Sequence, residues 1–190
     1  MQDSVSANTM TNTLEQYRAV VARCKDMYVK KAKDYGTSWR VLRPISIVDQ
    51  IYIKAWRIRQ IQETGQQKIG DSIESEFEGI VNYGIIALVQ GAMPADAPTE
   101  LSYEEAKQWY ETKAQEIEDL MQQKNHDYGE AWRELSQQSF VDLILVKLLR
   151  IKQILANDGQ TIVSEGADAN FCDIVNYAIF ALIKIGENKA

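Results

Sequence analysis

The chain contains the same sequence unit twice. Residues 27–61 align with residues 120–154 at a constant offset of 93, and sixteen of the thirty-five aligned positions are identical. After one inserted residue, residues 77–88 align with 171–182, where eight of twelve positions are identical. The shared segments read DYGxxWR, SxVDxIxxKxxRIxQI and FxxIVNYxIxAL. A tandem duplication of a unit of roughly eighty residues restricts the fold to two copies of one small architecture.

Each copy is predicted to form three helices, because apolar residues recur at helical spacing and no alternating strand pattern is bracketed by turns. The expected helices are 13–33, one opening at Ser46, and 71–90 in the first copy, then 103–126, one opening at Ser139, and 165–185 in the second. Ser102 and Glu105 form a capping-box pattern. Ser46 and Ser139 each precede an aspartate by three residues, so Asp49 and Asp142 are interpreted as capping residues. Gly36 and Gly129 suit the left-handed residue that ends a helix.

The domain organisation follows from the repeat. Repeat 1 spans 13–90, a linker containing Pro94 and Pro98 spans 91–102, and repeat 2 spans 103–186. Neither unit alone has enough residues for a sizeable core. We therefore predict an all-α protein in which the two three-helix units pack about a pseudo-twofold axis as one helical bundle.

Composition narrows the class of protein. A net charge of −6 argues against direct nucleic-acid binding, which needs a basic surface, but not against a small nucleotide. Two cysteines, Cys24 and Cys172, form no disulfide framework, so a reducing cytoplasm is expected. The N-terminal residues lack a signal-peptide pattern. The longest apolar stretch, 174–185, is too short to span a bilayer, so we expect no membrane partner.

The second helix of each copy carries a cation on its apolar face. Lys54 lies within the isoleucine stripe of repeat 1, with Arg57 at its edge, and repeat 2 has Lys147 and Arg150 at the same places. An unpaired buried charge costs several kcal/mol, so each cation needs a partner.

The third helix offers acidic partners. Helical spacing places on one ribbon Asp71, Glu74, Glu78 and Asn82 in repeat 1, and Glu165, Asp168, Cys172 and Asn176 in repeat 2, with Asp173 one position along. One interpretation is a set of interhelical salt bridges. The other is Mg²⁺ held by the carboxylates of Asp71, Glu74 and Glu78, or of Glu165, Asp168 and Asp173, with the lysines and arginines facing phosphates.

Two shared motifs supply further ligand-binding candidates. Asp34 and Asp127 lie at helix C-termini, where a carboxylate is unfavourable by about 0.3–1 kcal/mol. A ligand role and simple common origin explain their presence equally well, and the adjacent Tyr35 and Tyr128 are able to stack on a ligand.

The Asn-Tyr pairs of the third helices are the second motif. Asn82-Tyr83 and Asn176-Tyr177 lie in mid-helix, where asparagine has poor propensity. This favours a ligand role for the amide over a purely structural polar network.

Together these motifs resemble a known family. KNHDYG, Lys-x-x-Arg on the next helix, and paired acids leading into Asn-Tyr resemble the nucleotide modification associated domain, in the duplicated form of Bacteroidetes-type bacteria. The resemblance covers both repeats and implies a role in nucleotide metabolism or base modification. It implies a more distant similarity to the MazG-like all-α nucleoside triphosphate pyrophosphohydrolases, which bind Mg²⁺ through two acidic pairs.

The sequence departs from the pyrophosphohydrolase pattern. Lys54 and Lys147 stand where the first acidic pair would be, and Gly79 is the counterpart of Asp173. The expected function is nucleotide binding, with Mg²⁺-dependent phosphoanhydride hydrolysis by Glu165, Asp168 and Asp173 as its enzymatic version. The alternative is a non-catalytic helical interaction module. A homodimer is compatible with either.

Overall fold

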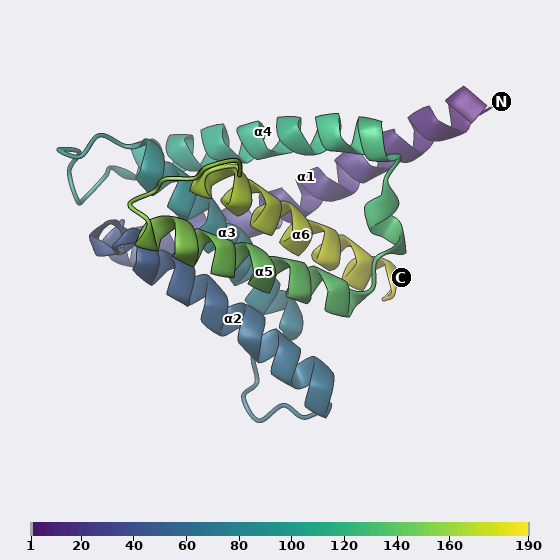
Figure 1. Ribbon diagram of the computed structural model, residues 1–190, viewed down its shortest axis with the longest axis horizontal. Helices are drawn as coiled ribbons and strands as arrows, with labels where there is room; N and C mark the ends of the chain where they lie inside the picture. The colour runs from purple at the N-terminus through teal and green to yellow at the C-terminus, as the bar shows by residue number, and fades with distance from the viewer. Residues whose placement is uncertain (1, 190) are drawn as a thin grey trace.

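The computed structural model describes residues 2–189, with side chains described from Asn12 onward, and every regular element in this range is helical. The described residues form six α-helices and two short 3-10 helices, with three α-helices and one 3-10 helix in the same order in each repeat. They are α1 (Gln2–Tyr35), η1 (Ser38–Val41), α2 (Pro44–Thr64) and α3 (Ile73–Ala92), followed by α4 (Tyr103–Tyr128), η2 (Ala131–Glu134), α5 (Gln137–Ala156) and α6 (Ala167–Glu187). Figure 1 shows how the six α-helices are arranged. The predicted all-α class and the two matching helix triplets are confirmed.

Most predicted helix ends lie within two residues of those observed. The Ser102 side chain accepts from the amide of Glu105, whose carboxylate accepts from the amide of Ser102, so the capping box is formed. Gly36 and Gly129 have φ values of 66° and 58°, as expected for residues that end α1 and α4. Helix α1 begins at Gln2, well before the expected Thr13, and residues 2–12 contain no glycine or proline that would stop it.

The capping roles predicted for Asp49 and Asp142 are wrong. Helix α2 begins at Pro44, whose fixed φ suits a first helical position, and α5 begins after Ser136, whose hydroxyl accepts from the amide of Ser139. Both aspartates therefore lie inside their helices. Asp49 forms an ion pair with Lys152 at 2.7 Å, and Asp142 lies 3.6 Å from Arg59.

These two ion pairs reveal the symmetry of the molecule. Asp49 and Asp142 are counterparts in the repeat, and so are Arg59 and Lys152, so each repeat makes the same contact to the other. Helix α1 packs on α4, α2 on α5 and α3 on α6, so each helix contacts its own counterpart. Such reciprocal contacts are those of a twofold axis, here within one chain.

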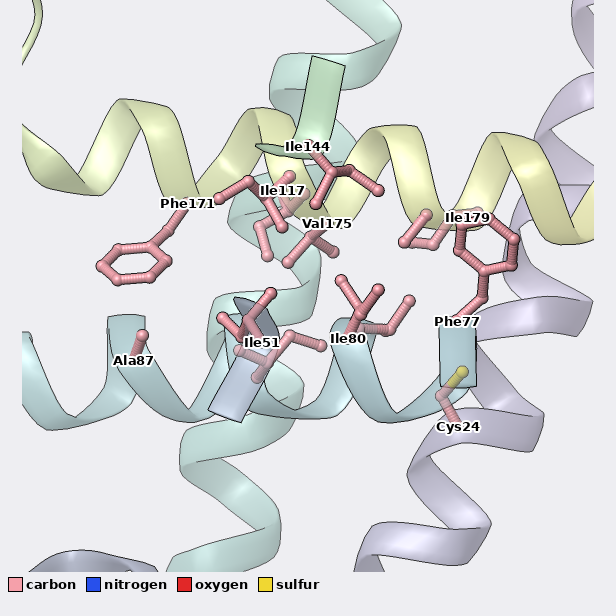
Figure 2. Packing of buried hydrophobic residues seen from close by; sticks show 14 of the residues in the cluster. Cys24, Ile51, Phe77, Ile80, Ala87, Ile117, Ile144, Phe171, Val175 and Ile179 are labelled. Atoms are coloured by element: carbon pink, nitrogen blue, oxygen red, sulfur yellow. The ribbon is translucent and has the colours of Figure 1, made fainter. Parts of the chain in front are cut away.

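The centre of the bundle is the α3–α6 pair. Figure 2 shows Phe171, Val175 and Ile179 of α6 facing Ile80 and its neighbours on α3, with side chains of the other helices closing the space. Helix α6 is long and apolar enough to cross a membrane by composition, but 67% of its most apolar window is buried in the protein. It is therefore the core helix of this bundle.

Candidate functional site

A cavity of about 450 Å³ lies within repeat 1, between α1, η1, α2 and α3. This volume falls in the range of small-molecule sites, roughly 300–1,000 Å³. Its walls are formed by Met27, Tyr28, Lys31, Ala32, Tyr35, Gly36, Ser38, Trp39, Leu42, Gln50, Lys54, Ser75, Glu78, Gly79, Asn82, Tyr83 and Ile86. All of them belong to the first copy of the duplicated unit.

The lining combines cations, aromatic rings and an apolar floor. Lys31 comes from α1 and Lys54 from α2, so two lysines line the cavity from different helices. Tyr35 and Tyr83 contribute aromatic faces, and the Tyr35 side chain is 57% exposed. A ligand with an anionic group and a flat ring would find a partner here for each part.

The cations predicted on α2 share one buried carboxylate. Glu76, only 7% exposed, lies 3.2 Å from Nζ of Lys54 and also forms an ion pair with Arg57. Arg57 further donates to the backbone carbonyls of Ile69 and Asp71. Glu76 therefore has two cationic partners, and one of them, Lys54, also lines the cavity.

Gly79 makes room for the end of Lys54. A Cβ atom placed on Gly79 would lie 2.8 Å from Cε and 3.1 Å from Nζ of Lys54. The lysine chain therefore occupies the space of an absent side chain on α3. Glycine inside a helix costs about 0.5–1 kcal/mol relative to alanine, so this space is kept at the expense of helix stability.

In repeat 2 the equivalent position carries Asp173, and its carboxylate joins two lysines. One oxygen lies 2.6 Å from Nζ of Lys147 and the other 2.5 Å from Nζ of Lys124. These lysines are the counterparts of Lys54 and Lys31. Burial raises the pKa of Asp173, but hydrogen bonds from both lysines and their charges outweigh it, so the pKa lies below the usual value. The carboxylate is ionised and fully engaged at neutral pH.

Other cavity-lining positions also differ in repeat 2. Cys172 replaces Glu78, and burial raises the pKa of its thiol to about 11, so it carries no charge at neutral pH. Phe180 replaces Ile86 and stacks on Trp132 with ring centroids 4.3 Å apart. Arg150, the counterpart of Arg57, is exposed and with Glu165 lines an open depression of about 880 Å³ beside the 157–166 loop.

The acidic ribbons are not gathered into a metal centre. Glu74 pairs with Lys189, Glu78 pairs with Arg23 at 2.6 Å, and Asp71 is exposed. In repeat 2 Glu165 and Asp168 are exposed, whereas Asp173 is buried and bound to lysine. Among the described residues, no three His, Cys, Asp or Glu side chains are placed to hold a metal ion. The residues present therefore do not fit a resident Mg²⁺, and this geometry lends no support to the expected catalytic carboxylates.

The asparagines of the Asn-Tyr pairs have structural partners. Asn82 accepts from the hydroxyl of Tyr110 at 2.8 Å and donates to the Cys24 carbonyl, and Asn176 accepts from the hydroxyl of Tyr17 at 2.8 Å. Tyr17 and Tyr110 are counterparts, so these hydrogen bonds repeat the twofold pattern. Asn82 and Tyr83 still line the cavity, whereas Asn176 is buried and Tyr177 is half-buried.

The residues of the Asp-Tyr-Gly motif divide in the same way. Asp34 and Asp127 are exposed, and Asp127 contacts only the neighbouring His126 among its described ion pairs. Tyr35 lines the repeat 1 cavity, whereas Tyr128 is 74% exposed.

Three important residues were absent from the predicted site. Glu76 lies on the buried face of α3 with Ile73, Phe77 and Ile80, and this helical spacing indicated a buried acid. Lys31 and Lys124 begin the shared motif at the same offset as the other repeated residues. Their convergence on the third helix depends on how α1 and α4 cross the bundle, which the sequence pattern does not reveal.

Comparison with known families adds an independent observation. The family model for nucleotide modification associated domain 1 matches residues 31–90 and 124–185, once in each repeat and over more than half of the chain. The chain belongs to this family. The two matched regions contain both lysine pairs and also Gly79 and Asp173. No curated protein and no solved structure matches the chain significantly, so the distant similarity to MazG-like enzymes stays a prediction.

Proposed function

We propose that this protein binds a nucleoside phosphate in the repeat 1 cavity and acts in nucleotide metabolism or base modification. The observation that carries the proposal is a 450 Å³ cavity lined by Lys31, Lys54, Tyr35 and Tyr83, in a chain of a family named for nucleotide modification. The two ammonium groups would face the phosphates, and the tyrosine rings would contact the base.

The lining supports a nucleotide over a purely apolar ligand. Lys31 has no ion-pair partner among residues 12–189, and Lys54 has one, Glu76, at 3.2 Å, which it shares with Arg57. Ammonium groups at a cavity wall form strong, charge-assisted hydrogen bonds with phosphate oxygens. Gln50 and Ser75 add polar groups, while Trp39, Leu42 and Ile86 give apolar surface. The arrangement would serve a cytoplasmic protein, in keeping with two free thiols.

The proposed activity is binding without a metal held by the protein, because the carboxylates nearest the cavity are engaged by cations. Glu76 is held by Lys54 and Arg57, and Glu78 by Arg23. Hydrolysis of a phosphoanhydride remains the enzymatic alternative, and we derive no step for it from these residues.

The test is a thermal-shift screen of nucleosides and their mono-, di- and triphosphates, followed by calorimetry on the best ligand. A ligand present at a hundred times its Kd stabilises the folded state by about 2.7 kcal/mol. We expect nucleotides to raise the melting temperature, the matching nucleosides to do so less, and binding to persist in EDTA.

A matched pair of variants locates the site. Tyr35→Ala should weaken nucleotide binding, whereas Tyr128→Ala, its counterpart in repeat 2, should leave it unchanged, because only Tyr35 lines the cavity. Equal effects of the two changes would place the ligand elsewhere. If no nucleotide binds, the interaction-module alternative gains support, and the exposed Ile53, Trp56 and Leu149 of α2 and α5 offer it a surface.

A further inference from the structure

The two repeats place the same pair of lysines in different surroundings. In repeat 2 the carboxylate of Asp173 lies between Lys124 and Lys147, with only 9% of its side chain exposed. In repeat 1 the corresponding helix position is Gly79, both counterpart lysines line a cavity, and Lys54 pairs with Glu76. In repeat 2 this crossing of three helices thus holds one carboxylate between two ammonium groups.

Other differences between the repeats also agree with a site that is open to a ligand in repeat 1 and closed in repeat 2. Gln50 and Ser75, both polar and at the cavity wall, correspond to Leu143 and Ala169 in repeat 2. The polar lining that a ligand would use is thus present where the carboxylate is missing. This polar lining is absent from repeat 2, where Asp173 supplies the carboxylate.

We propose that the repeat 1 cavity binds a phosphate group at the place that the Asp173 carboxylate takes in repeat 2, and that repeat 2 is a latent copy of the same site, closed by its own aspartate. Lys31 and Lys54 hold the incoming phosphate as Lys124 and Lys147 hold Asp173. Gly79 is the determinant of the open state. This inference rests on the proposed function only for the identity of the whole ligand.

The first experiment closes the open site. Binding of inorganic pyrophosphate is measured by calorimetry and thermal shift for the full chain, with KCl at equal ionic strength as the salt control. Gly79→Asp should weaken pyrophosphate binding at least tenfold, because the new side chain displaces the end of Lys54 from beside Gly79 and its carboxylate pairs with the lysines in place of the ligand. Gly91→Asp puts the same charge on α3 outside the cavity and should bind like the unmodified protein.

A stability readout tests the pairing itself. Lys31→Met should leave the melting temperature of the ligand-free protein nearly unchanged, but should lower it in the Gly79→Asp background, where Lys31 gains a partner. In the Gly79→Asn background, which adds the same bulk without charge, Lys31→Met should again have little effect. Equal effects of Lys31→Met in all three backgrounds would show that residue 79 does not meet Lys31.

The second experiment opens the closed site. Asp173→Gly should add a second pyrophosphate site, raising the stoichiometry from one to two. A folded Asp173→Gly protein that still binds one pyrophosphate would refute the latent copy, and if this variant does not fold, the Gly79 variants decide alone. The inference is overturned if pyrophosphate does not bind, or binds equally well to Gly79→Asp.

The outcomes separate this inference from the proposed function. Nucleotide binding that is insensitive to Gly79→Asp, without pyrophosphate binding, rejects the phosphate position and keeps the function. Pyrophosphate binding that depends on Gly79, without binding of any nucleotide, keeps the phosphate position and rejects the function.

Discussion

The surroundings of Lys54 and Lys147 bear on the two interpretations of these lysines, as members of interhelical salt bridges or as cations that face a phosphate. Lys147 is 13% exposed and is held by Asp173, so it matches the interhelical salt-bridge interpretation. Its partner is Asp173, not the exposed Glu165 or Asp168. Lys54 shares Glu76 with Arg57 and reaches a cavity. The two lysines occupy corresponding positions in the repeats, yet their environments differ. The acid that each meets is Glu76 on α3 but Asp173 on α6, and Asp173 lies three residues, about one helical turn, beyond the position that corresponds to Glu76.

Lys147→Met should therefore destabilise the protein more than Lys54→Met. Breaking a buried ion pair costs about 3–5 kcal/mol, and the loss for Lys147→Met should fall near the lower end because Lys124 still contacts Asp173. Lys54→Met leaves Glu76 paired with Arg57, so its loss should be smaller. Free energies of unfolding in urea measure both.

The double variant Lys147→Met/Asp173→Asn supplies the control. It should recover part of the stability, since the stranded carboxylate is removed together with its partner, and the double-mutant cycle should show favourable coupling. Additive losses would mean that the observed pair contributes nothing to stability.

At the scale of the helix, the features predicted correctly are those set by residues close together in the sequence. The helix triplets, the capping box at Ser102 and the glycine ends of α1 and α4 all involve residues a few positions apart, so periodicity and local chemistry revealed them. The starts of α2 and α5 were wrong by two residues because the Ser-x-x-Asp pattern also describes residues that pair across the bundle.

The candidate site was less predictable for the same reason. The lysine and arginine positions were recognised, but the acid that each would meet depends on the rotation of α3 or α6 about its axis. Glu76 and Asp173 face α2 and α5, whereas Glu74 and Asp168 face outward to other contacts. At about 100° per residue, the two positions between Glu74 and Glu76 and the five between Asp168 and Asp173 place the members of each pair on different sides of their helix.

A pair of serine substitutions tests the observed helix starts. Ser136→Ala removes the hydroxyl that accepts from the Ser139 amide and should cost about 0.5–2 kcal/mol. Ser46→Ala, at the position first expected to cap α2, should change stability by less than about 0.5 kcal/mol, typical of surface sites, because the cap position there is Arg43. Chemical denaturation compares the two, and a larger loss for Ser46→Ala would contradict the observed start of α2.

At the scale of the whole molecule, the repeats share one core. Each helix packs on its counterpart from the other repeat, and the α3–α6 pair at the centre belongs equally to both (Figure 2). The predicted boundaries at 90 and 103 thus separate repeats in the sequence, while the buried surface joins them in space.

We therefore expect one cooperative unfolding transition for the full chain. Scanning calorimetry should give a calorimetric enthalpy equal to the van't Hoff enthalpy, as for a single two-state unit. Lys147→Met, which weakens only repeat 2, should lower the melting temperature of this single transition. A second transition in the variant, with repeat 1 still melting at the original temperature, would show that the repeats are independent.

The internal twofold axis also determines how such a protein can change. In a homodimer of single repeats, one gene encodes both sites, so any substitution at the position of Gly79 would appear at both. Joining the two units in one chain keeps the interface but gives each site its own codon. Two of the four glycine codons differ from an aspartate codon by a single base, so one mutation in a fused gene can convert one site and leave the other as it was.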